Sequence, residues 1–127
     1  METSGPASRR RFLMDALTVV AADAPAQVAW LEKHGVVVDE IALNFDDAFR
    51  MAERLVEEGV LSPATLPQLR LIDSSFAEMT RDGSSDRWTT AALRSDEGWS
   101  QARGVARQIL AREGLDWSVL PDICVVR

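Results

Sequence analysis

Apolar residues recur every three or four positions along most of this chain, which is the periodicity of an amphipathic α-helix. A first helix is predicted over residues 9–22, and its apolar face comprises Phe12, Leu13, Ala16, Leu17 and Val20. Asp23 is expected to cap a second helix, which has Pro25 in its first turn and ends at Gly35.

The clearest helical pattern is NFDDAFRMAERLVEEG, residues 44–59. Asn44 is the expected cap, and Asp46 and Asp47 follow in the first turn, where the helix dipole favours negative charge. The apolar face comprises Phe45, Ala48, Phe49, Ala52, Leu55 and Val56. Gly59 is expected to end this helix.

Three further helices are predicted over residues 62–80, 86–93 and 95–114. Each begins with a residue type that caps helices well: Ser62, Asp86 and Ser95. The core faces of the two longer helices comprise Leu69, Ile72, Phe76 and Met79, then Trp99, Ala102, Ala106, Ile109 and Leu110.

These patterns define an all-α fold: a single domain over residues 9–127, built as a bundle of about five to six helices. Residues 1–8 are rich in turn formers and are predicted to be a flexible leader. The β-branched run at 36–38 has no second strand to pair with, so an extended linker is expected there. The apolar tail at 115–127 is expected to pack on the bundle, either as a helical turn or extended.

Composition and charge narrow the class of partner. Of the 127 residues, 46% are hydrophobic and 27% are charged, as in an ordinary folded domain. With 14 basic and 20 acidic residues the net charge is −6, which repels nucleic acids and anionic membranes. No apolar run is long enough to span a bilayer. A protein partner is therefore expected, and neither nucleic acid nor membrane.

The single cysteine and the single histidine argue against two common kinds of site. Cys124 has no partner for an internal disulfide, and His34 alone cannot supply the paired imidazoles of most transition-metal sites. We therefore expect a reducing, cytoplasmic environment, with no metal and no other cofactor. No phosphate-binding loop or nucleophile motif is present, so no catalytic residue is predicted.

The N-terminal stretch SRRRFLM resembles the start of a twin-arginine export signal, and residues 24–26 resemble a cleavage site. Asp15 and Asp23, however, confine the apolar run between them to residues 16–22. Because a carboxylate beside that run opposes membrane insertion, the stretch is interpreted as the first helix of a cytoplasmic domain. Export from Arg9-Arg10 is the alternative.

Carboxylates are densest in the middle of the chain. They are Asp39, Glu40, Asp46, Asp47, Glu53, Glu57 and Glu58, with only Arg50 and Arg54 between them. Glu53 and Glu57 have the spacing of a carboxylate metal site, but the Glu-x-x-His pairs of a di-iron bundle are missing from the sequence. The segment is therefore either a solvated face with internal ion pairs or an acidic face that docks a partner.

Arg103 and Arg107 lie one turn apart on the last predicted helix and could hold a carboxylate or a phosphate. Pairing with the acidic helix, within the fold or across a homodimer, is the simpler interpretation. The tryptophans fall on the apolar sides of their segments and are expected in the core, whereas an exposed one would mark a binding hot spot. They are Trp30, Trp88, Trp99 and Trp117.

The blocks DEIALNFDDAFRMAERLVEEGVLSP and RWTTAALRSDEGWSQARGVARQIL resemble segments of small, acidic, all-helical actinobacterial proteins of unknown function. The resemblance covers about residues 28–112. It implies an all-α cytoplasmic protein. Because no chemistry is attached to these motifs, it transfers no catalytic residue to this chain.

Three functions remain in view. The favoured one is a protein-binding or regulatory module, of which a toxin-neutralising immunity protein is one kind. Its candidate partner-binding residues are Asp39, Glu40, Asp46, Asp47, Glu53, Glu57, Arg103 and Arg107. A small-ligand binder or enzyme with an interhelical pocket of arginine and carboxylate is the first alternative, and an oligomeric scaffold, such as a homodimer, is the second.

Overall fold

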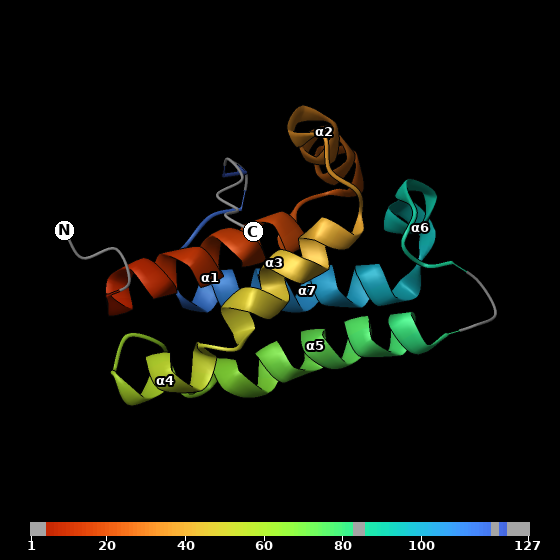
Figure 1. Ribbon diagram of the computed structural model, residues 1–127. Coiled ribbons are helices and arrows are strands. Elements are labelled where there is room, and N and C mark those ends of the chain that lie inside the picture. The colour runs from red at the N-terminus through yellow and green to blue at the C-terminus, as the bar shows by residue number, and fades with distance from the viewer. Residues whose placement is uncertain (1–4, 83–85, 118–119, 122–127) are drawn as a thin grey trace.

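The computed structural model describes residues 5–82, 86–117 and 120–121 (Figure 1). Within these ranges the chain forms seven α-helices and no strand, which confirms the all-α single-domain prediction. The helices are α1 (Pro6–Ala21), α2 (Ala24–His34), α3 (Asp39–Phe49), α4 (Ala52–Glu57), α5 (Thr65–Arg81), α6 (Thr90–Ser95) and α7 (Glu97–Arg112).

α1 is the central helix of the bundle. It packs against α3, α4 and α7, and α7 in turn packs against α5 and α6 (Figure 1). From Leu13 to Ala21 every residue of α1 except Asp15 is buried. The sequence predicted one apolar face for this helix, but its C-terminal half is enclosed on all sides, as expected of a helix that is apolar all round.

The acidic middle of the chain folds differently from the prediction. α3 begins at Asp39, so Asn44 is a buried residue within the helix and not its cap. Asp39 and Glu40 occupy the first turn, where the helix dipole stabilises carboxylates. The helix predicted through residue 59 is interrupted at Arg50 and Met51 and continues as α4, which explains why the bundle has one helix more than expected.

Three other predicted caps lie close to the observed helix starts. The Asp86 carboxylate accepts a hydrogen bond from the Trp88 amide (2.9 Å), and Thr89 is the side chain that caps α6. Asp96, one residue after the predicted cap, accepts the Gly98 amide (2.7 Å) at the start of α7. The Ser62 hydroxyl accepts the Ala64 amide (3.3 Å), and α5 then begins at Thr65.

The N-terminal helix and the C-terminal tail can be compared with their predictions. α1 begins at Pro6, so residues 6–8 of the predicted leader are helical. In the tail, Trp117 and Leu120 are half-buried against the core, and the Trp30 indole donates a hydrogen bond to the Pro121 carbonyl (2.8 Å). Cys124 lies outside the described residues. Within those residues, no helix combines the length and the apolar character needed to cross a membrane.

Gly98, at the start of α7, lies close to the side chains of two neighbouring segments. A Cβ added there would lie 2.8 Å from the Met79 sulfur of α5 and 2.9 Å from Nη2 of Arg87. The Arg87 guanidinium is held in place by both oxygens of Asp96, at 2.7 and 2.9 Å. Only glycine therefore lets the first turn of α7 approach both groups.

We expect Gly98→Ala to lower the free energy of unfolding by about 1–3 kcal/mol, because overpacking forces its neighbours apart. Gly104→Ala in the same helix is the matched control, since nothing lies within 4 Å of its added Cβ. There the higher helix propensity of alanine should raise stability by about 0.5–1 kcal/mol. Urea denaturation measures both values, and effects of the same sign would contradict the assignment.

Candidate functional site

An open groove of about 430 Å³ lies between α3 and α5. α3 contributes residues three or four positions apart, including Asp39, Ala42 and Asp46, and α5 contributes Asp73 and Phe76 in the same way. The two helices converge toward the C-terminal end of α3 and diverge toward α6 (Figure 1). We call the end of the groove near the C-terminus of α3 its narrow end, and the end near α6 its open end.

The floor of the groove is aromatic. Phe45 of α3 packs edge-on against Phe76 of α5, with ring centroids 5.7 Å apart, and Phe76 in turn contacts Trp88 at 5.9 Å. Beneath them lies the fully buried Trp99, 5.5 Å from Trp88. Trp88 is half-buried, and of the tryptophans it is the one that lines the groove.

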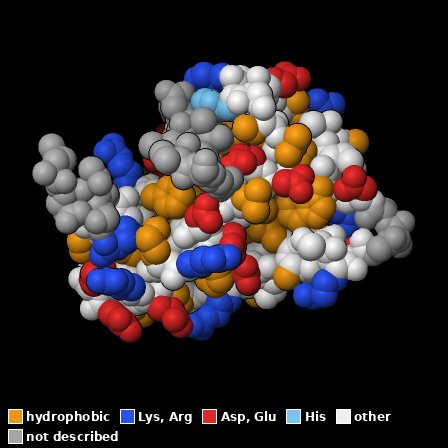
Figure 2. Space-filling view, viewed as in Figure 1, with side chains coloured by type: hydrophobic (Ala, Val, Ile, Leu, Met, Phe, Trp, Pro, Cys, Tyr) orange, Lys and Arg blue, Asp and Glu red, His pale blue; other side chains and the backbone are white. Residues whose placement is uncertain are grey.

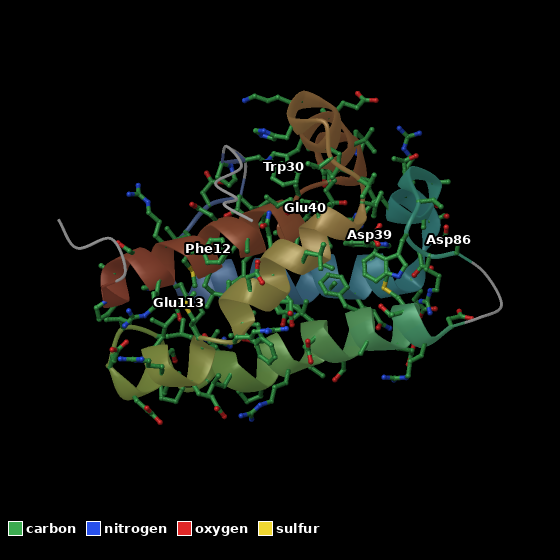
Figure 3. All side chains as sticks on the ribbon, in the orientation of Figure 1. Phe12, Trp30, Asp39, Glu40, Asp86 and Glu113 are labelled. Atoms are coloured by element: carbon green, nitrogen blue, oxygen red, sulfur yellow. The ribbon has the colours of Figure 1, made fainter. Side chains whose placement is uncertain are left out.

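Carboxylates occupy the walls above this floor. Asp39 stands at the end of the groove near α6 (Figure 3). Asp46 faces Asp73 at the narrower end, where Asp46 also pairs with Arg50 at 2.9 Å. Figure 2 shows carboxylates interleaved with hydrophobic side chains over α3 and α5. This combination suits an amphipathic cation, which carboxylates and aromatic faces both attract.

Asp73 is the most unusual of these groups. Among the described residues it has neither an ion pair nor a hydrogen bond, although its side chain is partly buried. Burial raises the pKa of its carboxyl, and the negative charge of Asp46 raises that pKa further. The folded protein thus keeps a carboxylate in a place that disfavours its ionised form.

The groove continues into a smaller hollow of about 320 Å³ at its narrow end. Phe49 and Leu66 line it, and Arg70 of α5 pairs with Glu53 of α4 at 3.2 Å. This ion pair bridges α4 and α5 at the end of the groove opposite Trp88.

The structure therefore brings only some of the predicted acidic residues together. Asp39, Asp46 and Glu53 line the groove and its extension. Glu40 and Asp47 lie on α3 outside both hollows, and Glu57 is exposed on α4. Residues of one helix separate in this way because only positions three, four or seven apart share a face.

Sequence analysis missed Asp73, Phe76 and Trp88 as site residues. Phe76 and Trp88 were assigned to the core, and Asp73 was not singled out. One signal was present: Asp73 follows Leu69 by four positions and precedes Phe76 by three, so it lies on the apolar stripe of α5. Its pairing with Asp46 required the tertiary arrangement.

Arg103 and Arg107 serve the interior of the fold. Arg103 donates to the Ala22 carbonyl (2.8 Å), and Arg107 donates to the Ala21 carbonyl (2.8 Å) at the C-terminus of α1. Arg103 also donates to Gln27 Oε1 (2.9 Å) and to the Leu93 carbonyl (3.0 Å). The guanidinium donors of Arg103 and Arg107 that could bind an external anion thus already donate hydrogen bonds within the chain.

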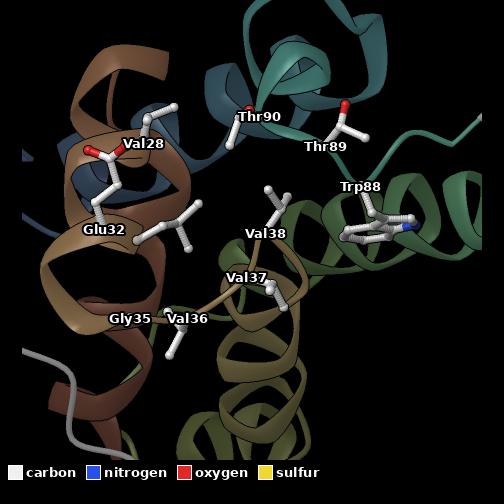
Figure 4. A pocket seen from close by; sticks show the side chains of 10 residues that line it. Val28, Glu32, Gly35, Val36, Val37, Val38, Trp88, Thr89 and Thr90 are labelled. Atoms are coloured by element: carbon white, nitrogen blue, oxygen red, sulfur yellow. The ribbon is translucent and has the colours of Figure 1, made fainter.

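A second cleft, of about 360 Å³, lies between α2 and the start of α6 (Figure 4). Val28, Val36 and Val38 line it together with Trp88, which also lines the groove, and Glu32 is its charged residue. It is a mainly apolar hollow without convergent polar groups, so its chemistry is less specific than that of the groove between α3 and α5.

Comparisons with protein-family models, with curated proteins and with solved structures find no match to this chain. Within the described ranges, no three histidine, cysteine or acidic side chains gather in a way that could hold a metal ion.

We expect Arg103→Met to lower the free energy of unfolding by about 3 kcal/mol, because it leaves buried acceptors without donors. The exposed Arg94 of α6 provides the control, and Arg94→Met should change stability by less than about 0.5 kcal/mol. Thermal and urea denaturation measure both variants. Equal losses for the two variants would refute the role assigned to Arg103.

Asp73 should make stability depend on pH with a defined sign. Its carboxyl has a raised pKa in the folded chain, so its ionisation destabilises the fold as pH rises from the ordinary value of 3.8 through that pKa. Asp73→Asn cannot ionise, so its stability advantage over the parent should grow across that window and then level off. Urea denaturation from about pH 3 to pH 7 tests this. An advantage that is independent of pH would contradict it.

Proposed function

We propose that this chain is a protein-binding module that holds a basic, partly apolar segment of a partner protein in the groove between α3 and α5. Asp73 is the observation that carries the proposal. A partly buried carboxylate without a cation destabilises the fold, and a lysine or arginine from a partner would offset that penalty.

The surroundings of Asp73 favour a protein segment as the source of that cation. The half-buried Trp88 and the exposed Leu43 offer apolar area for anchoring side chains above the buried Phe45 and Phe76, and apolar and aromatic residues are the usual composition of an interface centre. The net charge of −6 adds long-range attraction for a basic partner and accelerates encounter.

A regulatory role of the immunity kind is one biological form of this proposal. Such a protein would cover a basic site on a toxin and so block its contact with an anionic target. The pocket of arginine and carboxylate has less support, because Arg103 and Arg107 bind carbonyls at the end of α1. The oligomeric scaffold, including the homodimer, remains a proposal that no specific contact favours. Membership of the actinobacterial group also remains a proposal.

We also propose a cytoplasmic location. α1 provides Leu13, Leu17 and Val20 to the centre of the core, where each is fully buried. Cleavage near residues 24–26, as twin-arginine export would require, would remove this helix and expose the apolar faces of α3 and α7 that pack on it.

A phage-displayed library of random peptides, selected against the full chain, tests the binding function. We expect the enriched peptides to be basic and to contain leucine or aromatic residues, and to bind more weakly as salt concentration rises. Asp73→Asn should weaken their binding by about 5–10-fold, the effect of losing one partly buried ion pair.

Asp47→Asn is the matched control, because Asp47 is on α3 next to Asp46 but does not line the groove. It removes the same charge from the whole molecule and should leave affinity almost unchanged. Equal losses of affinity for both variants would mean that the peptides respond only to the net charge of the molecule and not to the groove. Enriched peptides without positive charge would refute the proposal.

A further inference from the structure

The spacing of the carboxylates along the groove indicates the conformation of the segment that it binds. Asp39 and Asp46 are seven residues apart on α3, nearly two full turns, so they share a face. Their backbone positions are separated by about 10.5 Å along the helix axis. Asp73 stands opposite Asp46, so the narrow end carries two carboxylates, of which Asp46 also pairs with Arg50, and the open end carries Asp39.

A bound segment must present two cations on one face at this separation. In an extended segment, residues on the same face are two or four positions apart, which gives about 6.7 or 13 Å. Neither value matches the distance between the two acidic positions. In an α-helix, residues seven positions apart share a face at about 10.5 Å, so a helix lying along α3 matches both acidic positions.

The floor between the acidic positions specifies what lies between the cations. Phe45 and Phe76 form it, and Leu43, which is 50% exposed, stands at its edge. Residues three and four positions after the first cation of a bound helix would point into this floor. The groove is open to solvent along α3 and α5, so a helix of the partner could lie along it, as in other helix-in-groove complexes.

We infer that the occupant is an amphipathic α-helix with basic residues seven positions apart and apolar residues between them, in the pattern Lys/Arg-x-x-Leu-Leu-x-x-Lys/Arg. This inference rests on the proposed function and adds the conformation and register of the partner. The cation at the narrow end lies between Asp46 and Asp73 and neutralises the repulsion between them. The other cation pairs with Asp39 at the open end.

Three synthetic peptides of about 18 residues test the register, each with the same composition and with its two lysines spaced four, seven or eleven positions apart. All three spacings keep both lysines on one helical face, so only the distance between the charges changes. Titration calorimetry with the full-length chain should give at least about fivefold tighter binding for the spacing of seven, the effect of one ion pair.

A proline placed between the lysines of the best peptide should abolish that preference, because it breaks the helix. Asp39→Asn should weaken binding of the spacing-seven peptide and remove its advantage over the other two, whereas Asp47→Asn should preserve the advantage. Circular dichroism of the free peptides controls for differences in helicity.

The outcomes separate this inference from the proposed function. Equal binding of the three spacings, or binding that survives the proline, would overturn the helical register while leaving a basic-segment module in place. Spermidine that displaces the peptide and binds as tightly would overturn it in favour of a site for small polycations. Failure of all the peptides, together with failure of the displayed library, would overturn both proposals.

Discussion

The C-terminus of α1 imposes the constraint on which the rest of the structure depends. A helix end enclosed by protein exposes carbonyls that water cannot reach, and each needs a donor. Gln27 donates to the Val19 and Val20 carbonyls at 3.0 and 3.1 Å, and two arginines of α7 supply the next two. Their positive charges also complement the negative end of the helix dipole. α1 can therefore lie at the centre of the bundle, with α3, α4 and α7 around it.

The N-terminal end of α1 is held by ion pairs in which α1 itself supplies the arginines. Arg9 reaches Glu58 at 2.9 Å, and Arg10 reaches Glu113 at 3.0 Å, so the basic start of the chain ties α1 to the ends of α4 and α7. The polar groups at both ends of α1 are thus matched to partners. Asp73 departs from this pattern, because its charge is left without a cation in a desolvated place. A desolvated carboxylate that lines a groove is a place where function is reasonably sought.

The positions of the helices were largely predictable because they depend on local apolar periodicity and on glycines that end helices. Gly35, Gly59 and Gly114 all adopt positive φ values at helix ends, where glycine has no steric penalty. The start of α3 was predicted too late, since Asn44 has the chemistry of a cap while its position in the bundle is buried. Of the candidate site, Asp39, Asp46 and Glu53 could be named from charge density, but the same criterion also selected Glu40, Asp47 and Glu57.

The sequence by itself determined the all-α class, the approximate helix ends and the acidic character of α3, because these depend on residues near one another in the chain. Only the tertiary structure decided which charges act together. It brought Asp73 next to Asp46, separated by 27 positions in the chain, and it assigned Arg103 and Arg107 to the end of α1. The reason is that desolvation and pairing depend on distance in space, and helical periodicity does not specify which helices become neighbours.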